Sequence, residues 1–251
     1  MNQCDKDCPV EDPLEQVRLL YTELAQNPEK EFGWGKGKEN ASTLGYAGEW
    51  LSCLPDSVWK SAAAVGNPFS LGPVHAGETV IDIGCGAGAD ACIAAMLVGK
   101  TGMVLGIDCT PAMITRAREN AEVSGLPQVV FQVADMTELP LTDSAADLLI
   151  SNGAINLAKD KDAVLAEAYR VLRPGGRLQI ADMVRDTSTR NSVCCHAEES
   201  WADCVSGTLE PGTFLFMLTK AGFVDAELVG FTAYRTATST TGALFRAVKP
   251  G

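Results

Sequence analysis

The sequence has few basic residues and no long apolar run. It carries 20 Lys and Arg against 32 Asp and Glu, so its formal net charge at pH 7 is −12. Because nucleic-acid binding needs clustered Lys and Arg, this balance argues against a nucleic-acid partner and against an anionic membrane surface. The longest apolar run, 91–98, is far too short to span a bilayer, and residues 1–12 are polar and acidic. We therefore expect a cytoplasmic protein with neither a nucleic-acid nor a membrane partner.

Internal repeats and low-complexity segments are also absent, and histidine is scarce, with two residues. The length of 251 residues fits one α/β domain with appendages, and a hydrophobic content of 46% supports a sizeable core. Cysteine, in contrast, is frequent, with nine residues. In a reducing compartment these cysteines are thiols, which are either buried or available for soft-metal and metalloid chemistry.

The stretch 79–88 predicts a strand, a glycine turn and the start of a helix. The apolar residues Val80, Ile81 and Ile83, interrupted only by Asp82, are typical of a buried parallel strand, and a glycine turn with Gly84, Gly86 and Gly88 follows. Glycine permits a tight turn and a close approach of the backbone to a ligand. Strand, glycine turn and helix form the nucleotide-binding half of a doubly wound sheet, in which ligands lie beyond the carboxyl ends of the strands.

Acidic residues near the ends of three expected strands narrow the choice of ligand. The glycines also match a dinucleotide fingerprint, but Asp82 beside the turn would repel a pyrophosphate and could bind a cationic amino group. Asp108 ends the next strand, about 20 residues further on, where an acid suits ribose hydroxyls. Asp135 follows a third strand and could accept a hydrogen bond from an adenine amino group. Together they predict a site for a positively charged nucleoside such as S-adenosylmethionine, which has no phosphate.

The rest of the chain reads as alternating strands and helices between an N-terminal helical region and a C-terminal pair of strands. The expected strands are 79–83, 103–108, 129–133, 146–151, 177–182, 224–232 and 243–248. The principal expected helices begin at Asp12, Ala89, Thr110, Lys161 and Pro211.

Four segments, 82–88, 106–108, 134–136 and 171–176, resemble in order the motifs of class I S-adenosylmethionine-dependent methyltransferases. The resemblance implies a doubly wound, seven-stranded, Rossmann-like α/β sheet in a single domain covering residues 1–251. It implies an N-terminal helical lid at 1–77 and a cofactor-binding core at 78–182. Residues 183–251 would carry a substrate-side insertion after strand five and the last strands.

The resemblance also implies S-adenosylmethionine as the cofactor. Asp82 would bind the ammonium, Asp108 the ribose diol and Asp135 the adenine amino group, with Met136 packed on the adenine. Cys85 has the simpler interpretation of a small core residue as well. The complete set of expected cofactor residues is Asp82, Gly84, Cys85, Gly86, Asp108, Cys109, Asp135, Met136 and Asn152.

Further stretches, among them 66–68, 108–113, 151–157 and 201–207, resemble arsenite methyltransferases. That family usually has a cysteine at the positions of Val65 and Gly153, and only Cys204 matches a family cysteine. The resemblance implies that trivalent arsenic is the methyl acceptor, with a thiol reductant as a further partner. Trivalent arsenic binds two or three thiolates together. We therefore expect Cys194 and Cys195 to replace the two missing cysteines, so that the catalytic ligands are Cys194, Cys195 and Cys204, with no resident metal.

Other functions remain open, because fold and cofactor motif do not determine the acceptor. The missing cysteines favour a small organic acceptor methylated at O, N, S or C. An oxygen or thiol acceptor would benefit from a general base, for which His196, Glu198, Glu199 and Asp203 are candidates. A catalytically silent binding module and a nicotinamide oxidoreductase are the remaining alternatives.

Overall fold

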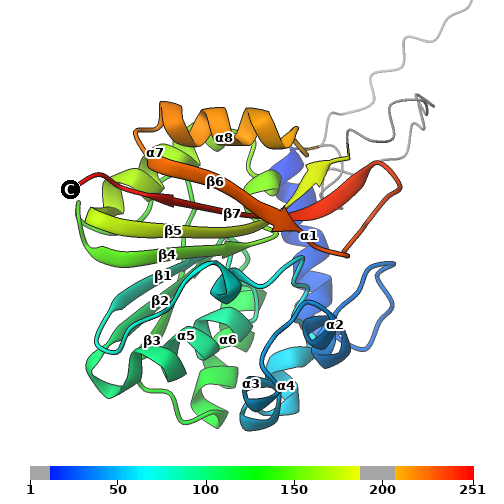
Figure 1. Cartoon of the computed structure of the whole chain (residues 1–251). Helices are drawn as coiled ribbons and strands as arrows, with labels where there is room; N and C mark the ends of the chain where they lie inside the picture. The colour runs from blue at the N-terminus through cyan, green and yellow to red at the C-terminus, as the bar shows by residue number, and fades with distance from the viewer. Residues whose placement is uncertain (1–11, 187–206) are drawn as a thin grey trace, which may run out of the picture.

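Seven strands form one sheet with the order β3-β2-β1-β4-β5-β7-β6 (Figure 1). The computed structural model describes residues 12–186 and 207–251, so Cys194, Cys195 and Cys204 lie outside the described residues. The strands are β1 Thr79–Ile83, β2 Met103–Asp108, β3 Val129–Val133, β4 Ala146–Asn152, β5 Leu172–Arg185, β6 Val224–Phe231 and β7 Thr240–Val248. The predicted seven-stranded, Rossmann-like sheet is confirmed.

The first five strands are parallel, and helices cover both faces of this part of the sheet. Val80 packs toward α5 and α6, whereas Ile81 and Ile83 pack toward α7 and α8. Both faces of β1 are therefore buried, which explains why its sequence is apolar on both faces except for Asp82. The long helices are α1 Pro13–Gln26, α5 Ala89–Val98, α6 Pro111–Val123, α7 Lys161–Val171 and α8 Pro211–Lys220.

Short helices precede the sheet and pack on the same face as α5 and α6 (Figure 1). Asp12 caps α1 as predicted, because its carboxylate accepts a hydrogen bond from the Leu14 N–H at 3.3 Å. Tyr46 and Trp59 from this region enter the core. The short helices are α2 Gly37–Thr43, α3 Gly48–Cys53, α4 Asp56–Lys60 and the 3-10 turn η1 Pro68–Leu71, and two more 3-10 turns are η2 Gly99–Thr101 and η3 Ile155–Leu157.

The direction of strand succession reverses between β1 and β4. Strands β2 and β3 lie on one side of β1, whereas β4 and β5 lie on the other. At such a switch point the crossovers leave toward opposite faces, so a crevice opens beyond the carboxyl ends of the central strands. The glycine turn after β1 lies at this crevice.

Strand β5 is longer than the sequence predicts. We expected residues 177–182, but the strand begins at Leu172 and ends at Arg185. The pairing with β4 jumps from Ala146–Leu172 to Leu148–Arg177, so residues 173–176 bulge out of the sheet. The Pro-Gly-Gly sequence at 174–176 therefore interrupts this strand and does not precede it.

Two antiparallel strands complete the sheet. Strand β7 pairs with the whole second half of β5, from Arg177 to Arg185, and β6 forms the edge. In the described ranges, no helix is long and apolar enough to cross a membrane.

Candidate functional site

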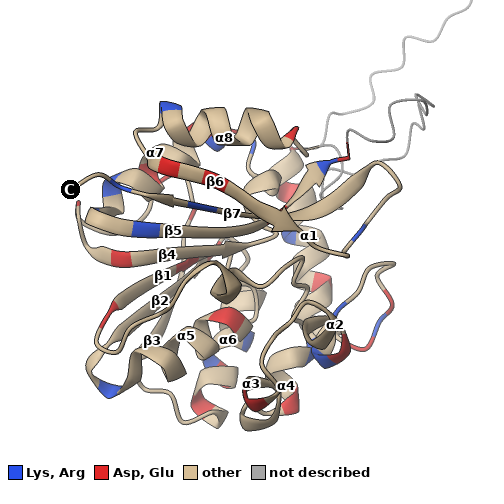
Figure 2. Cartoon of the chain, viewed as in Figure 1, with Lys and Arg blue, Asp and Glu red and all other residues tan. Residues whose placement is uncertain are grey.

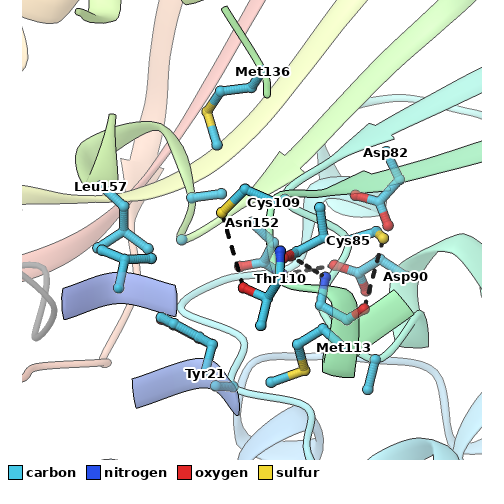
Figure 3. Close-up of a pocket in the computed structure, with 18 of the residues that line it drawn as sticks. Tyr21, Asp82, Cys85, Asp90, Cys109, Thr110, Met113, Met136, Asn152 and Leu157 are labelled. Carbon is cyan, nitrogen blue, oxygen red and sulfur yellow. Dashed lines mark hydrogen bonds between the residues drawn. The ribbon is translucent and has the colours of Figure 1, made fainter. Parts of the chain in front are cut away.

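A cavity of about 440 Å³ lies at the carboxyl ends of β1, β2 and β4. Its size is within the usual range for a small-molecule site. All nine predicted cofactor residues line it, namely Asp82, Gly84, Cys85, Gly86, Asp108, Cys109, Asp135, Met136 and Asn152. In the view of Figure 3, Asp82 and Asp90 lie at one end, and Tyr21 and Leu157 at the other.

The glycine turn is held against the end of β2. The N–H groups of Gly84 and Cys85 both donate to the Ile107 carbonyl, at 2.7 and 2.9 Å. Gly84 and Gly86 have φ values of 70° and 51°, which disfavour residues with a side chain. A Cβ at Gly84 would lie 2.1 Å from the Cβ of Ala154, whereas one at Gly86 would meet nothing within 4 Å. Gly84 is thus required by packing, and Gly86 leaves open space.

Asp108 joins the end of β2 to the glycine turn. Its Oδ2 accepts from the Gly86 N–H at 2.9 Å and its Oδ1 from the Thr110 N–H at 2.8 Å. Burial raises the pKa of Asp108, although these hydrogen bonds from Thr110 and Gly86 oppose the rise. The carboxylate is fixed in orientation, and each oxygen keeps a further lone pair for ligand hydroxyls.

Asp82 is buried, and a hydrogen bond with the Ala91 backbone only partly compensates its charge. Its side chain is 2% exposed, and its Oδ2 has no hydrogen-bond partner in the described part of the chain. Burial raises the pKa of Asp82 well above its ordinary value, and the nearby carboxylates of Asp90 and Asp108 add to the rise. A cationic ligand would reverse this penalty. The orphaned acid and the open space at Gly86 therefore fit the ammonium and the close approach of S-adenosylmethionine.

Asp135 and Met136 follow β3 at the same crevice. Asp135 Oδ1 accepts hydrogen bonds from the N–H and the hydroxyl of Thr137, each at 2.8 Å. Its second oxygen is not used in these bonds and can accept from a ligand. Met136 packs against the cluster of apolar side chains on the α7 and α8 face. The labelled Met136 side chain lies across the cavity from Met113 and Tyr21 (Figure 3).

Tyr46 and Asp90 also line the cavity, and our sequence reasoning missed both. Asp90 accepts from the Tyr46 hydroxyl at 2.7 Å and from Asn152 Nδ2 at 2.8 Å. Burial raises the pKa of Asp90, and these hydrogen bonds from Asn152 and Tyr46 oppose the rise. A buried acid in the first turn after Gly88 could have been recognised from sequence. No local signal points to Tyr46.

Thiols in the cavity are not reactive as placed. Of the four described cysteines, Cys85 and Cys109 line the cavity, whereas Cys53 is exposed and Cys92 is buried. Burial raises the pKa of Cys85 and of Cys109, and it raises that of Cys92 to about 12. These thiols therefore stay protonated at neutral pH. Among the described residues, no group of three or more His, Cys, Asp or Glu side chains could hold a metal ion.

Val65 and Gly153, where the sequence lacks the expected cysteines, face each other. A Cβ built on Gly153 would lie 3.1 Å from Cγ1 of Val65. The carbonyl of Ala63 lies 4.0 Å from the same point. The two positions are therefore neighbours next to the carboxyl end of β4, and the Val65 side chain lies where a side chain at position 153 would begin. Along the ribbon of Figure 2, basic and acidic residues are interspersed.

Comparison with known proteins agrees with this geometry. A family model described as a methyltransferase domain matches residues 74–222. An arsenite methyltransferase of Halobacterium salinarum is 37% identical over 185 residues, covering 74% of this chain and 47% of that protein. A 27-O-demethylrifamycin SV methyltransferase of Amycolatopsis mediterranei is 36% identical over 113 residues, covering 45% of this chain and 41% of that protein. The chain spans about half the length of the curated relatives that it matches.

A solved structure agrees as well. The arsenic(III) S-adenosylmethionine methyltransferase of Chlamydomonas reinhardtii is 29% identical, with a TM-score of 0.57, covering 84% of this chain and 72% of that one. The family model covers more than half of the chain, and the acidic residues that we predicted to bind the cofactor line the cavity. The chain therefore belongs to the methyltransferase domain family, with S-adenosylmethionine as its cofactor.

Proposed function

We propose that this protein transfers a methyl group from S-adenosylmethionine to trivalent arsenic. The observation that carries the proposal is its similarity to arsenite methyltransferases, at 37% identity over 74% of the chain. The stretch 151–157 and the segment around Cys204 belong to the part of the sequence that resembles those enzymes.

The cofactor end of the cavity supplies binding and orientation. Asp82 would accept from the ammonium, Asp108 from the ribose hydroxyls and Asp135 from the adenine amino group. Met136 would pack on the adenine ring. When bound, S-adenosylmethionine supplies an electrophilic methyl group on its sulfonium. A fixed cavity holds both reactants in the geometry of an in-line displacement, which contributes through proximity and orientation.

At the acceptor end, Cys204 with Cys194 and Cys195 would hold arsenic as thiolates. Thiolate ligands leave the arsenic lone pair free, so no general base is needed. Because methylation makes arsenic pentavalent, an external thiol reductant would return it to the trivalent state before any further transfer. This role for the three cysteines is part of the proposal, since they lie outside the described residues.

A small organic acceptor is a second candidate, and a specific observation favours it. Val65 and Gly153 lie next to each other and carry no thiol where arsenite methyltransferases usually have cysteines. The cavity wall beyond the cofactor residues is largely apolar and includes Leu14, Val17 and Leu157. A relative named for methylating 27-O-demethylrifamycin SV supports an organic acceptor, although the match covers less than half of the chain.

The test is an anaerobic incubation with S-adenosylmethionine, arsenite and a thiol reductant, with arsenic species measured by mass spectrometry. Cys204→Ser should lower methylated arsenic by about 100-fold or more, because a reacting atom without its ligand loses its position. Cys53→Ser is the matched control, because Cys53 is an exposed thiol outside the cavity. It should leave the rate unchanged.

If the parent protein binds S-adenosylhomocysteine but forms no methylated arsenic, the arsenic proposal is wrong. The same protein would then be screened with labelled S-adenosylmethionine against hydroxyl, amine, thiol and carbon acceptors. Labelled product from one of these classes would establish the second candidate.

A further inference from the structure

Residues 61–67, named the strap here, form neither helix nor strand. The first part of the strap, 61–64, lines the cavity, and 65–67 follow directly in the chain. The N–H of Gly37 donates to the Ala62 carbonyl at 2.9 Å, and Asn40 Nδ2 donates to the Ala64 carbonyl at 2.8 Å. Helix α2 thus holds the first half of the strap from outside.

The centre of the strap is held by a cluster of three side chains. Asn152 Oδ1 accepts from the Val65 N–H at 3.0 Å, and Asn152 Nδ2 lies 2.9 Å from the Gly66 carbonyl. The Tyr46 hydroxyl lies 3.2 Å from the same carbonyl and 2.7 Å from Asp90 Oδ1. These contacts join the N-terminal region, the start of α5 and the end of β4 at one point.

The available protons decide how this cluster is connected. The Tyr46 hydroxyl has a single proton, and its shorter contact, to the Asp90 carboxylate, is the stronger one. Tyr46 therefore donates to Asp90 and accepts from Asn152 Nδ2 at 2.9 Å. Both polar groups of the Asn152 amide are engaged within the protein. Asp90 also uses both oxygens internally, in contrast to Asp82, whose Oδ2 has no partner among the described residues.

We propose that Tyr46, Asp90 and Asn152 are positioning residues that hold the strap in place as a wall of the cofactor site. Asn152 then acts mainly by accepting from the Val65 N–H, while its two Nδ2 protons go to Tyr46 and Asp90, which differs from the direct contact expected from sequence. The buried position of Tyr46, 5% exposed, and of Asp90, 9% exposed, makes each lost hydrogen bond uncompensated by water. The proposal rests on cofactor binding in this cavity and does not depend on the acceptor.

Tyr46→Phe removes one hydroxyl and keeps the ring. We expect the dissociation constant of S-adenosylhomocysteine, measured by calorimetry, to rise roughly tenfold or more, because a displaced wall misplaces the ligand. Backbone amide hydrogen exchange in residues 61–67 should become faster in the same variant. Tyr169→Phe is the matched control, because Tyr169 packs on Phe223 and does not line the cavity. It should change neither measurement.

A double-mutant cycle separates this role from independent contacts. Tyr46→Phe combined with Asn152→Ala should raise the dissociation constant by less than the product of the two single effects, since both act through the strap. Multiplicative effects would contradict the proposal. So would weaker binding of Tyr46→Phe with unchanged strap exchange, which would make Tyr46 a direct ligand contact.

Unchanged binding and unchanged exchange would overturn the proposal as well. If Tyr46→Phe does not fold, Asp90→Asn is the second variant, because it preserves side-chain size and can still accept from Tyr46. It should then show weaker binding and faster strap exchange, and normal values for both would overturn the proposal. Since the readout is S-adenosylhomocysteine binding, failure of the arsenic proposal leaves this test intact.

Discussion

Single residues in the glycine turn meet different physical demands. Gly84 and Gly86 both have positive φ, yet only Gly84 has another side chain where its own would be. Gly86 faces open space and donates its N–H to Asp108. Gly84 therefore allows close packing against Ala154, whereas Gly86 leaves space for a ligand in the cavity.

Alanine at these two positions should separate stability from binding. Gly84→Ala should lower the free energy of unfolding by about 3 kcal/mol or more, because left-handed strain adds to a clash with Ala154. Gly86→Ala should cost only about 1–2 kcal/mol of strain but weaken S-adenosylhomocysteine binding roughly tenfold, because its methyl group enters ligand space. Urea unfolding and calorimetry measure the two effects. Equal losses of stability would contradict this division.

Buried carboxylates make cofactor binding sensitive to pH. Burial raises the pKa of Asp82 above its ordinary value, so the side chain stays protonated to higher pH than an ordinary carboxyl group, and a cationic ligand favours the ionised form. We expect the dissociation constant of S-adenosylmethionine to fall as pH rises above the ordinary carboxyl range, with release of a proton on binding. Calorimetry in two buffers of different ionisation enthalpy measures that proton.

Asp82→Asn is the control for this pH dependence, because it retains the shape of the side chain and cannot ionise. The variant should bind more weakly and should lose most of the proton release. Proton release that is identical in parent and variant would assign the titration to another group.

At the scale of elements, the end of β5 is tied to η3 through one acid. Asp182 accepts from the N–H and the Nδ2 of Asn156 at 3.2 and 2.8 Å, and from the Met183 N–H at 2.7 Å. Leu157, the last residue of η3, lines the cavity. Asp182 therefore stabilises η3, the turn that follows β4 and borders the cavity.

The pH dependence of stability should report Asp182. Burial raises its pKa to about 6, against the hydrogen bonds from Met183 and Asn156. An acid with a raised pKa stabilises the folded state when protonated, and this contribution is lost as pH rises through the folded pKa. Asp182→Asn cannot ionise, so it does not lose this contribution as pH rises. The free energy of unfolding of the variant minus that of the parent should therefore increase by about 2 kcal/mol from about pH 4.5 to about pH 7. A difference independent of pH in urea titrations would contradict the assignment.

At the scale of the whole molecule, strand order decides where the cavity lies. The reversal between β1 and β4 opens the crevice, and residues of α1, α5, α6 and η3 line it. The acidic residues around the glycine turn then make this crevice suited to a cation and unsuited to a pyrophosphate. A ligand that binds the crevice should therefore raise the thermal stability of the protein, and one that does not bind should leave it unchanged.

Thermal unfolding should distinguish the two cofactor classes. S-adenosylhomocysteine at about 100 times its dissociation constant should add about 2.7 kcal/mol, which corresponds to a rise in melting temperature of about 5–10 °C. NADH should cause no rise, because Asp82 and Asp108 oppose its phosphates. Scanning fluorimetry measures both, and a rise with NADH alone would favour the oxidoreductase alternative.

Local sequence determined three of the parallel strands and the nine predicted residues that line the cavity. Strands β1, β2 and β3 were recognisable from short apolar runs, and their bounds agree with prediction. The carboxyl ends of parallel strands meet at one edge, which is why acids far apart in sequence could be assigned to one site. Their binding roles and the proposed domain boundaries stay predictions.

Tertiary structure alone decided the contacts between distant segments. Three features depend on how distant segments pack. They are the proximity of Val65 to Gly153, the cluster of Tyr46 with Asp90 and Asn152, and the extension of β5. Asn152 and Val65 are 87 residues apart, and no periodic pattern links residues at such a separation. Periodicity reports which face of an element is buried, whereas the partner on that face is selected by packing of the whole chain.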